Sequence, residues 1–238
     1  MSKSIFVVTG ASSGFGACVS NLLLERESAD EIWLIARDKN KLESVSKTIN
    51  TKTKVLSLDL TKMDDLKKYE NELKKEKVII KVLVNSAGYG KFDHSENLDL
   101  ETKLNMIDLN IKASVSMIDY SLPYMDKGSK IMNIASCAGF QPIPYINDYA
   151  ATKAFLLSYS RALNKELKYR EIHVLTVCPF WTKTGFFDRA IDKDKKEVVI
   201  SYAAMYEPID VMKKAVRDLY NDKKDFLYMD LLIIFNVF

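Results

Sequence analysis

The chain of 238 residues has few of the residues that build loops and cross-links, with eight glycines, five prolines and three cysteines. So little glycine and proline argues against disorder, collagen-like repeats and a loop-built β-sandwich. The cysteines, Cys18, Cys137 and Cys178, are odd in number, far apart and without a CxxC pair. Neither a disulfide framework nor a zinc site is expected, and a reducing, cytoplasmic environment fits this cysteine content.

The chain also lacks the signatures of metal, nucleic-acid and membrane proteins. Its two histidines, His94 and His173, share no metal-ligand spacing, so we expect no metal. The net charge of +3 is too small to predict nucleic acid as a partner. The apolar run at 231–238 is far shorter than the roughly 20 residues that span a bilayer. We therefore expect no membrane partner, and keep tail-mediated membrane association only as an alternative.

What the sequence does contain is an alternation of short apolar runs and longer amphipathic stretches. This pattern is typical of βα units that form a parallel sheet. Helices are predicted at 14–26, 40–50, 62–75, 100–120 and 148–169. Strands are predicted at 5–9, 31–36, 54–58, 81–86, 130–135 and 173–177, with a seventh at 226–229.

No internal repeat, low-complexity tract or linker interrupts this alternation, which favours one domain over residues 1–238. The continuous apolar strands are those of a sheet covered on both faces. The predicted fold is therefore a three-layer α/β fold: a doubly wound parallel sheet of about seven strands with helices on both faces.

A glycine-rich turn follows the first predicted strand, where Thr9 and Gly10 lead to Gly14 and Gly16 in the spacing GxxxGxG. Glycines at such a strand-to-helix turn allow a tight bend and let the backbone approach a phosphate closely. The lysine of the GxxxxGK[ST] nucleotidase motif is missing. A dinucleotide is the better-fitting ligand than a nucleoside triphosphate.

The end of the second strand indicates which dinucleotide is preferred. An acidic residue there would bind the ribose 2′-hydroxyl, but this sequence has Ala36 followed by Arg37. A guanidinium can pair with a 2′-phosphate, so NADP is favoured over NAD. The alternative is that Arg37 is a solvated loop charge, partly cancelled by Asp38.

Tyr149 and Lys153 begin the last long predicted helix, and their i, i+4 spacing places both on one helical face. A phenol is a poor acid or base near neutral pH unless a cation stabilises its phenolate, which Lys153 would supply. The chain holds a second YxxxK, at Tyr220. Only the first pair has a serine, Ser136, thirteen residues upstream at the end of a predicted strand.

Taken together, these motifs resemble the short-chain dehydrogenase/reductase family, in the branch of about 250 residues with TGxxxGxG and YxxxK. The likeness covers nearly the whole chain. Its further blocks are Asp59 after the third strand, Asn85 to Gly88 after the fourth, Asn110 in the fourth helix, and Pro179 with Thr184 after the sixth strand.

The resemblance implies a Rossmann-like fold and an NAD(P)-dependent oxidoreductase that interconverts a carbonyl and an alcohol. It implies that Tyr149 is the general acid/base, that Ser136 stabilises the substrate oxygen, and that Lys153 lowers the tyrosine pKa. Asn110 would hold a proton-supplying water chain, or alternatively stabilise a local helix irregularity. The residues expected at the cofactor are Thr9, Gly10, Ser12, Ser13, Gly14, Phe15, Gly16, Arg37, Asp59, Leu60, Asn85, Ala87, Gly88, Tyr149, Lys153, Pro179, Thr182 and Thr184.

The substrate site is expected to be apolar and covered by a lid at 185–206. Residues that flank the catalytic group suggest a hydrophobic carbonyl or alcohol: Phe140, Ile143, Tyr145, Phe180, Trp181, Phe186 and Phe187. Phe180 stands where the family usually has glycine. It leaves open the alternative of a dinucleotide-binding sensor or scaffold without turnover. The resemblance also implies a homodimer or homotetramer.

Overall fold

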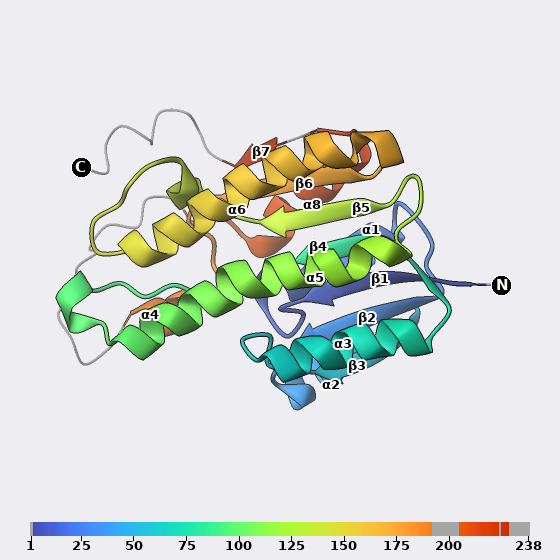
Figure 1. Cartoon of the computed structure of the whole chain (residues 1–238), viewed down its shortest axis with the longest axis horizontal. Helices are drawn as coiled ribbons and strands as arrows, with labels where there is room; N and C mark the ends of the chain where they lie inside the picture. The colour runs from blue at the N-terminus through green and yellow to red at the C-terminus, as the bar shows by residue number, and fades with distance from the viewer. Residues whose placement is uncertain (1, 192–204, 224, 229–238) are drawn as a thin grey trace.

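The computed structural model describes residues 2–191, 205–223 and 225–228. Its centre is a parallel sheet of seven strands in the order β3-β2-β1-β4-β5-β6-β7 (Figure 1). The predicted doubly wound sheet is thereby confirmed. The strands are β1 (Lys3–Thr9), β2 (Glu31–Ala36), β3 (Lys52–Ser57), β4 (Val78–Asn85), β5 (Lys130–Ile134), β6 (His173–Pro179) and β7 (Asp225–Tyr228).

Helices cover both faces of this sheet. In Figure 1, α3 (Met63–Lys75), α5 (Ala113–Ser121) and α6 (Asn147–Glu166) lie in front of it, and α1 (Gly14–Leu24) and α8 (Pro208–Tyr220) lie behind it. Each face has its own apolar core. Val19, Leu42 and Val211 belong to the core on the α1 side, where α2 (Lys39–Ser46) also packs. Trp33, Leu66 and Met117 belong to the core on the α3 side.

The direction in which the chain adds strands reverses between β1 and β4. From β1 the chain moves outward to β2 and β3, and then returns to β4 on the other side of β1. In open α/β sheets, ligands bind at such a switch point, beyond the carboxyl ends of the strands. Thr9, Ala36, Asn85 and Ile134 all end their strands at this edge.

The structure corrects the predicted helix at 100–120, which is not continuous. It consists of α4 (Leu100–Ile107), a π-helical turn η2 (Asp108–Lys112) and α5. The helix predicted at 40–50 ends earlier, at Ser46. Two helices were not predicted: α8, and the short α7 (Phe187–Ala190) inside the predicted lid.

Other predictions fall partly outside the described residues. The seventh strand is present as Asp225–Tyr228, but Met229 and the apolar tail 231–238 are not described. The lid prediction is described at 185–191 and 205–206 only. Within the described ranges, none of the helices has both the length and the apolar character needed to cross a bilayer.

Candidate functional site

A cavity of about 1360 Å³ opens at the carboxyl edge of the sheet. Drug-sized ligands occupy pockets of roughly 300–1,000 Å³, so this cavity has room for a dinucleotide and a further small molecule. Of the residues predicted to bind cofactor or act in catalysis, sixteen lie on its wall: Gly10, Ser12, Ser13, Gly14, Phe15, Arg37, Asp59, Leu60, Ala87, Gly88, Ser136, Tyr149, Lys153, Pro179, Thr182 and Thr184.

The turn between β1 and α1 forms the cradle at the switch point. Gly10 has φ of +64°, and a Cβ there would lie 2.8 Å from the Ala87 backbone nitrogen, so another residue would be strained and crowded. The N-cap residue Ser13 makes no side-chain cap bond, and the first turn of α1 holds no acidic residue. The N–H groups at this helix start are therefore available to an anion, which fits a dinucleotide's diphosphate.

The remaining predicted residues, Thr9, Gly16, Asn85 and Asn110, do not line the cavity but build its wall. The Thr9 hydroxyl accepts hydrogen bonds from the Ser86 and Ala87 backbone nitrogens, at 3.1 and 3.2 Å. Gly16 lies tightly against Gly10. Asn85 is buried and donates from Nδ2 to Asn133 Oδ1 at 2.9 Å. Thr9 thus supports the loop after β4, and Asn85 joins β4 to β5, while the contact of Thr9, Gly16 and Asn85 with the cofactor stays a prediction.

Asn110 lies in the π-helical turn η2 and is 1% exposed. Its Nδ2 donates to Tyr89 O at 2.9 Å and to Thr152 Oγ1 at 3.0 Å, while its Oδ1 accepts from Tyr89 N at 3.0 Å. One amide thus ties the loop after β4 to helix α6. The helix irregularity considered from the sequence is present, and a π-turn is a frequent feature of functional sites.

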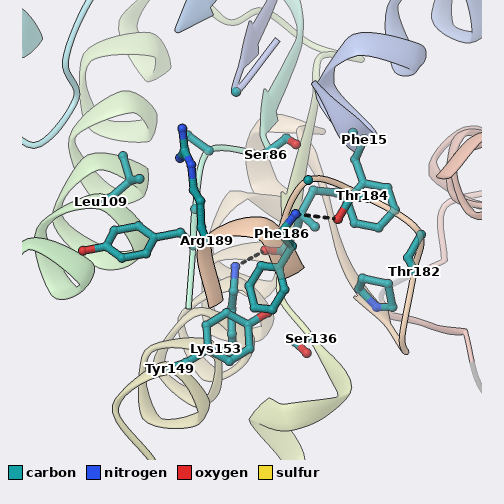
Figure 2. Close-up of a pocket in the computed structure, with 18 of the residues that line it drawn as sticks. Phe15, Ser86, Leu109, Ser136, Tyr149, Lys153, Thr182, Thr184, Phe186 and Arg189 are labelled. Atoms are coloured by element: carbon teal, nitrogen blue, oxygen red, sulfur yellow. Dashed lines mark hydrogen bonds between the residues drawn. The ribbon is translucent and has the colours of Figure 1, made fainter. Parts of the chain in front are cut away.

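Tyr149, Lys153 and Ser136 meet at the base of the cavity, where Tyr149 and Lys153 project from α6 (Figure 2). The Lys153 ammonium lies 5.6 Å from the centre of the Tyr149 ring and donates to Ile134 O at 2.8 Å. The Ser136 hydroxyl accepts from Ala138 N at 3.1 Å, which fixes its side chain at the end of β5. A proton donor, a cation and a hydroxyl therefore face one space.

Burial sets the protonation of this group. It raises the pKa of Tyr149 to about 12, although the neighbouring Ser136 hydroxyl acts in the opposite direction. It lowers the pKa of Lys153 to about 8, because the ammonium loses hydration. Near neutral pH the phenol therefore carries its proton and the lysine is largely charged. This combination suits proton donation to an oxygen on which negative charge develops.

Aromatic side chains cover the phenol. The Phe186 ring centre lies 5.2 Å from that of Tyr149, and a Cβ on Gly90 would lie within 3.0 Å of both rings. Phe92 packs edge-on against Phe186 at 5.9 Å between ring centres. All seven apolar residues predicted to surround the substrate line the cavity: Phe140, Ile143, Tyr145, Phe180, Trp181, Phe186 and Phe187.

At the β2 end of the cavity, Arg37 is exposed and lies on the wall. Its neighbour Asp38 caps α2, accepting from Lys41 N at 3.0 Å, so this carboxylate is engaged with its own helix. Asp59 accepts from Thr61 N and Thr61 Oγ1, at 3.1 and 2.8 Å, which shapes the loop after β3. The end of the cavity predicted to hold the ribose 2′ position thus presents the Arg37 guanidinium. The neighbouring carboxylates of Asp38 and Asp59 are bonded to other groups.

Sequence reasoning did not single out several residues that shape this site. Tyr89 and Thr152 hold Asn110, and Gly90 and Gly139 allow close packing against Tyr149 and Lys153. Arg189 on α7 also lines the cavity. Of these residues, Gly90 could have been noticed in the sequence, because it is one of only eight glycines and lies close to Gly88. The roles of the other residues depend on contacts between segments far apart in the chain.

Comparisons with known proteins agree with this geometry. The family model described as short chain dehydrogenase matches residues 4–195. An uncharacterised oxidoreductase of Staphylococcus epidermidis is 32% identical over 179 residues, which are 74% of this chain and 77% of that protein. A very-long-chain 3-oxoacyl-CoA reductase of Danio rerio is 38% identical over 188 residues, 75% of this chain but 59% of the relative.

Among solved structures, a short-chain dehydrogenase from Sphingobium yanoikuyae in complex with NADPH superimposes with a TM-score of 0.80 at 27% identity. The match covers 94% of this chain and 86% of the other. With the family model spanning most of the sequence and the relatives bearing oxidoreductase names, the predicted family and enzyme class are confirmed. The chain belongs to the short-chain dehydrogenase/reductase family of oxidoreductases.

Proposed function

We propose that this protein is an NADP-dependent oxidoreductase that interconverts a carbonyl and a secondary alcohol on a hydrophobic small molecule. The observation that carries the proposal is that Tyr149, Lys153 and Ser136 open into the same cavity as the glycine turn. A carbonyl placed against the phenol therefore lies in one continuous space with a diphosphate cradle.

Each residue of the site has its own role in carbonyl reduction. The nicotinamide supplies the hydride when the cofactor is bound. Tyr149 donates its proton to the carbonyl oxygen as negative charge grows there, and Ser136 donates a hydrogen bond to the same oxygen. Lys153 holds a positive charge 5.6 Å from the Tyr149 ring, which stabilises the phenolate that remains. Asn110 positions α6 relative to the loop after β4 through Thr152 and Tyr89.

Two features support NADP over NAD. Ala36 leaves no carboxylate to bind a ribose 2′-hydroxyl or repel a 2′-phosphate, and Arg37 on the cavity wall offers a guanidinium to that phosphate. The Sphingobium yanoikuyae neighbour was solved with NADPH. For the cradle we propose that the backbone of Ser12 to Phe15 holds the diphosphate.

The apolar wall supports a hydrophobic substrate. Phe186, Phe187 and Trp181 pack against one another, with ring centres 5.6 Å apart for both Phe187 pairs. The Danio rerio relative is named for the reduction of very-long-chain 3-oxoacyl-CoA, a carbonyl on a long apolar chain. Ketones with bulky apolar substituents and 3-oxoacyl thioesters are the substrates to test first.

We further propose that residues 1–238 form one domain, that 185–206 covers the substrate, and that the protein is a cytoplasmic homodimer or homotetramer. Gly185 to Arg189 line the cavity beside Tyr149, which supports the lid assignment for the described part of that segment. Exposed apolar side chains on α4 and α6 support self-association and are considered in the Discussion.

The test is a fluorescence titration of the purified protein with NADPH and NADH, repeated with Arg37→Ala. We expect NADPH to bind at least tenfold more tightly, with this preference lost in Arg37→Ala. Lys39→Ala is the matched control, because Lys39 is an exposed cation near Arg37 that pairs with Glu43 and lies off the cavity wall. Equal affinities for the two cofactors would contradict the NADP assignment.

Turnover separates an enzyme from a dinucleotide-binding sensor or scaffold. With NADPH bound, the carbonyl panel should oxidise the cofactor in the wild type, and Tyr149→Phe should abolish this while retaining binding. Binding without turnover across the whole panel would favour the sensor.

A further inference from the structure

Arg189 places a second guanidinium at the cavity, from a different element than Arg37. It belongs to α7, whereas Arg37 follows β2, and both residues line the cavity wall. Figure 2 shows the Arg189 side chain extending from α7 into the cavity, toward the side on which Leu109 is drawn. Leu109 lies next to Asn110 in η2, so Arg189 reaches across the cavity and away from the aromatic wall.

The backbone of Arg189 is held in place by contacts with the loop after β4. Its own N–H donates to Phe186 O at 3.1 Å, and Ala190 O accepts from Phe92 N at 2.9 Å. The Phe92 ring also packs edge-on against Phe187, at 6.4 Å between centres. The short helix is therefore anchored on both sides of Arg189.

Both guanidinium groups act on Tyr89, another residue of the cavity wall. The positive charges of Arg37 and Arg189 oppose the burial that raises the pKa of this phenol. The Tyr89 hydroxyl itself faces α4, at 3.1 Å from Thr102 O and 3.0 Å from Asn105 Oδ1. Its hydroxyl is thus engaged with α4, and Arg37 and Arg189 share the cavity wall with Tyr89 without bonding to it.

The cavity wall also holds three carboxylates, those of Asp38, Asp59 and Asp188. Asp38 caps α2 and pairs with Lys41, and Asp59 is bonded to Thr61. Within residues 2–191 and 205–223, neither arginine forms a side-chain hydrogen bond or an ion pair with a carboxylate. Two guanidinium groups that face one cavity, and that have no carboxylate partner in the part of the chain that the structure describes, form a site for a phosphate group.

We propose that Arg189 is a second phosphate-binding residue for the nicotinamide dinucleotide, which contacts the bound cofactor from α7 while Arg37 contacts it from the β2 side. The proposal rests on the dinucleotide binding proposed above and adds a residue that no motif predicts. The shared chemistry is a phosphate ester, either the 2′-phosphate or the diphosphate. The fixed fork of the guanidinium, rather than charge alone, makes the contact.

The experiment is a fluorescence titration with NADPH and with NADH, and a competition titration with adenosine 2′,5′-bisphosphate, for wild type, Arg189→Ala and Arg189→Lys. We expect Arg189→Ala to weaken NADPH binding roughly fivefold to tenfold, with Arg189→Lys recovering only part of it. Loss for NADPH and the bisphosphate alone assigns the contact to the 2′-phosphate. Equal loss for NADPH and NADH, with the bisphosphate unchanged, assigns it to the diphosphate.

Lys183→Ala is the matched control, because Lys183 is an exposed cation on the same segment that pairs with Glu207 at 2.6 Å and lies off the cavity wall. Arg189 is exposed, so its variants should keep the wild-type thermal midpoint. NADPH affinity within twofold of wild type in Arg189→Ala would overturn this inference alone, as would a change confined to substrate KM. Failure of the wild type to bind either dinucleotide would overturn it together with the proposed function.

Discussion

At the residue scale, Tyr149 and Lys153 are tuned by the same burial in opposite directions. Desolvation raises the pKa of the phenol to about 12 and lowers that of the ammonium to about 8. Both shifts have one cause, because burial disfavours the charged form of each group. The phenolate and the ammonium attract each other only after Tyr149 has given up its proton. This is a suitable arrangement for a proton donor that must recover its proton after every cycle.

The first prediction concerns the pH dependence of carbonyl reduction. Tyr149 keeps its proton up to about pH 12, so the donor is present throughout the working range. Lys153 is charged below its pKa of about 8 and neutral above it. We therefore expect kcat/KM for reduction to fall as the pH rises through about 8, measured from pH 6 to 10 by NADPH oxidation. A rate that stays flat to pH 10 would contradict the role given to the lysine charge.

The second prediction concerns stability. The pKa of Lys153 is 10.5 in the unfolded chain and about 8 in the folded protein. Between pH 8 and 10.5 the unfolded chain therefore binds more protons than the folded protein, so stability rises with pH. The lysine therefore lowers stability at pH 7 by about 3 kcal/mol relative to pH above 10.5. We expect Lys153→Met to raise the thermal midpoint relative to wild type by more at pH 7 than at pH 10. A difference between the two proteins that does not change with pH would count against this.

At the element scale, the site depends on how α6, η2 and the loop after β4 are joined. Asn110 makes three hydrogen bonds among these segments, and Gly139 lets the turn after Ser136 approach the Lys153 backbone closely. Contacts with two other segments thus fix the position of helix α6. The sequence of α6 alone does not determine that position.

The third prediction tests the π-helical turn. Asn110→Ala removes the side-chain partner of the Tyr89 backbone N–H and carbonyl, and one of the two partners of the Thr152 hydroxyl, which still donates to Tyr149 O. Each buried group left unpaired costs about 1–3 kcal/mol. We expect a lower thermal midpoint, measured by calorimetry, and a reduced kcat, measured by NADPH oxidation. Asn97→Ala is the control, because Asn97 is exposed and its side-chain amide donates to Asp93 Oδ1 at 2.9 Å. An Asn110→Ala variant as stable and active as this control would refute the positioning role.

Sequence patterns predicted the elements whose signal is local. The glycine turn and the Tyr149–Lys153 spacing depend on residues close together in the chain, so they were found with the correct strand and helix around them. Helix α8 was missed although Val211, Ala215 and Leu219 repeat at helical spacing.

Other features could not be read from the sequence. The π-turn interrupts a stretch with good helical periodicity, because Asn110 bonds to Tyr89 and Thr152, which lie 21 and 42 residues away. Arg189 gains its place from a four-residue helix held by Phe92. The hydrogen bonds of Thr9 to the loop after β4 and of Asn85 to Asn133 likewise join segments far apart in the chain. Long-range contacts decide all of these positions.

At the scale of the whole molecule, two helices in contact, α4 and α6, carry exposed apolar side chains. Leu100 and Leu104 on α4 are 69% and 51% exposed, and Phe155 on α6 is 41% exposed, stacked on Tyr159 at 5.7 Å. Helices α4 and α6 also pack against each other. Exposed apolar groups gathered on adjacent helices are typical of an interface, which supports the proposed homodimer or homotetramer.

The fourth prediction follows from this surface. We expect light scattering to give a dimer or tetramer for the wild type and a monomer for a Leu104→Glu, Phe155→Glu double variant, since burying two carboxylates is costly. Met63→Glu serves as the control, because Met63 is 46% exposed on α3, away from that surface. A monomeric wild type, or a double variant that keeps the wild-type mass, would contradict the assignment of the interface.

The most direct test of the central claim is to follow deuteride from NADPH deuterated at the nicotinamide C4 into the alcohol product by mass spectrometry. Hydrophobic ketones and 3-oxoacyl thioesters serve as acceptors. The account predicts deuterium on the carbinol carbon for the wild type and for Tyr169→Phe, whose phenol is 83% exposed. It predicts none above the blank for Tyr149→Phe, with NADPH still bound. Wild-type transfer in Tyr149→Phe, or no transfer by a wild type that binds NADPH, would contradict it.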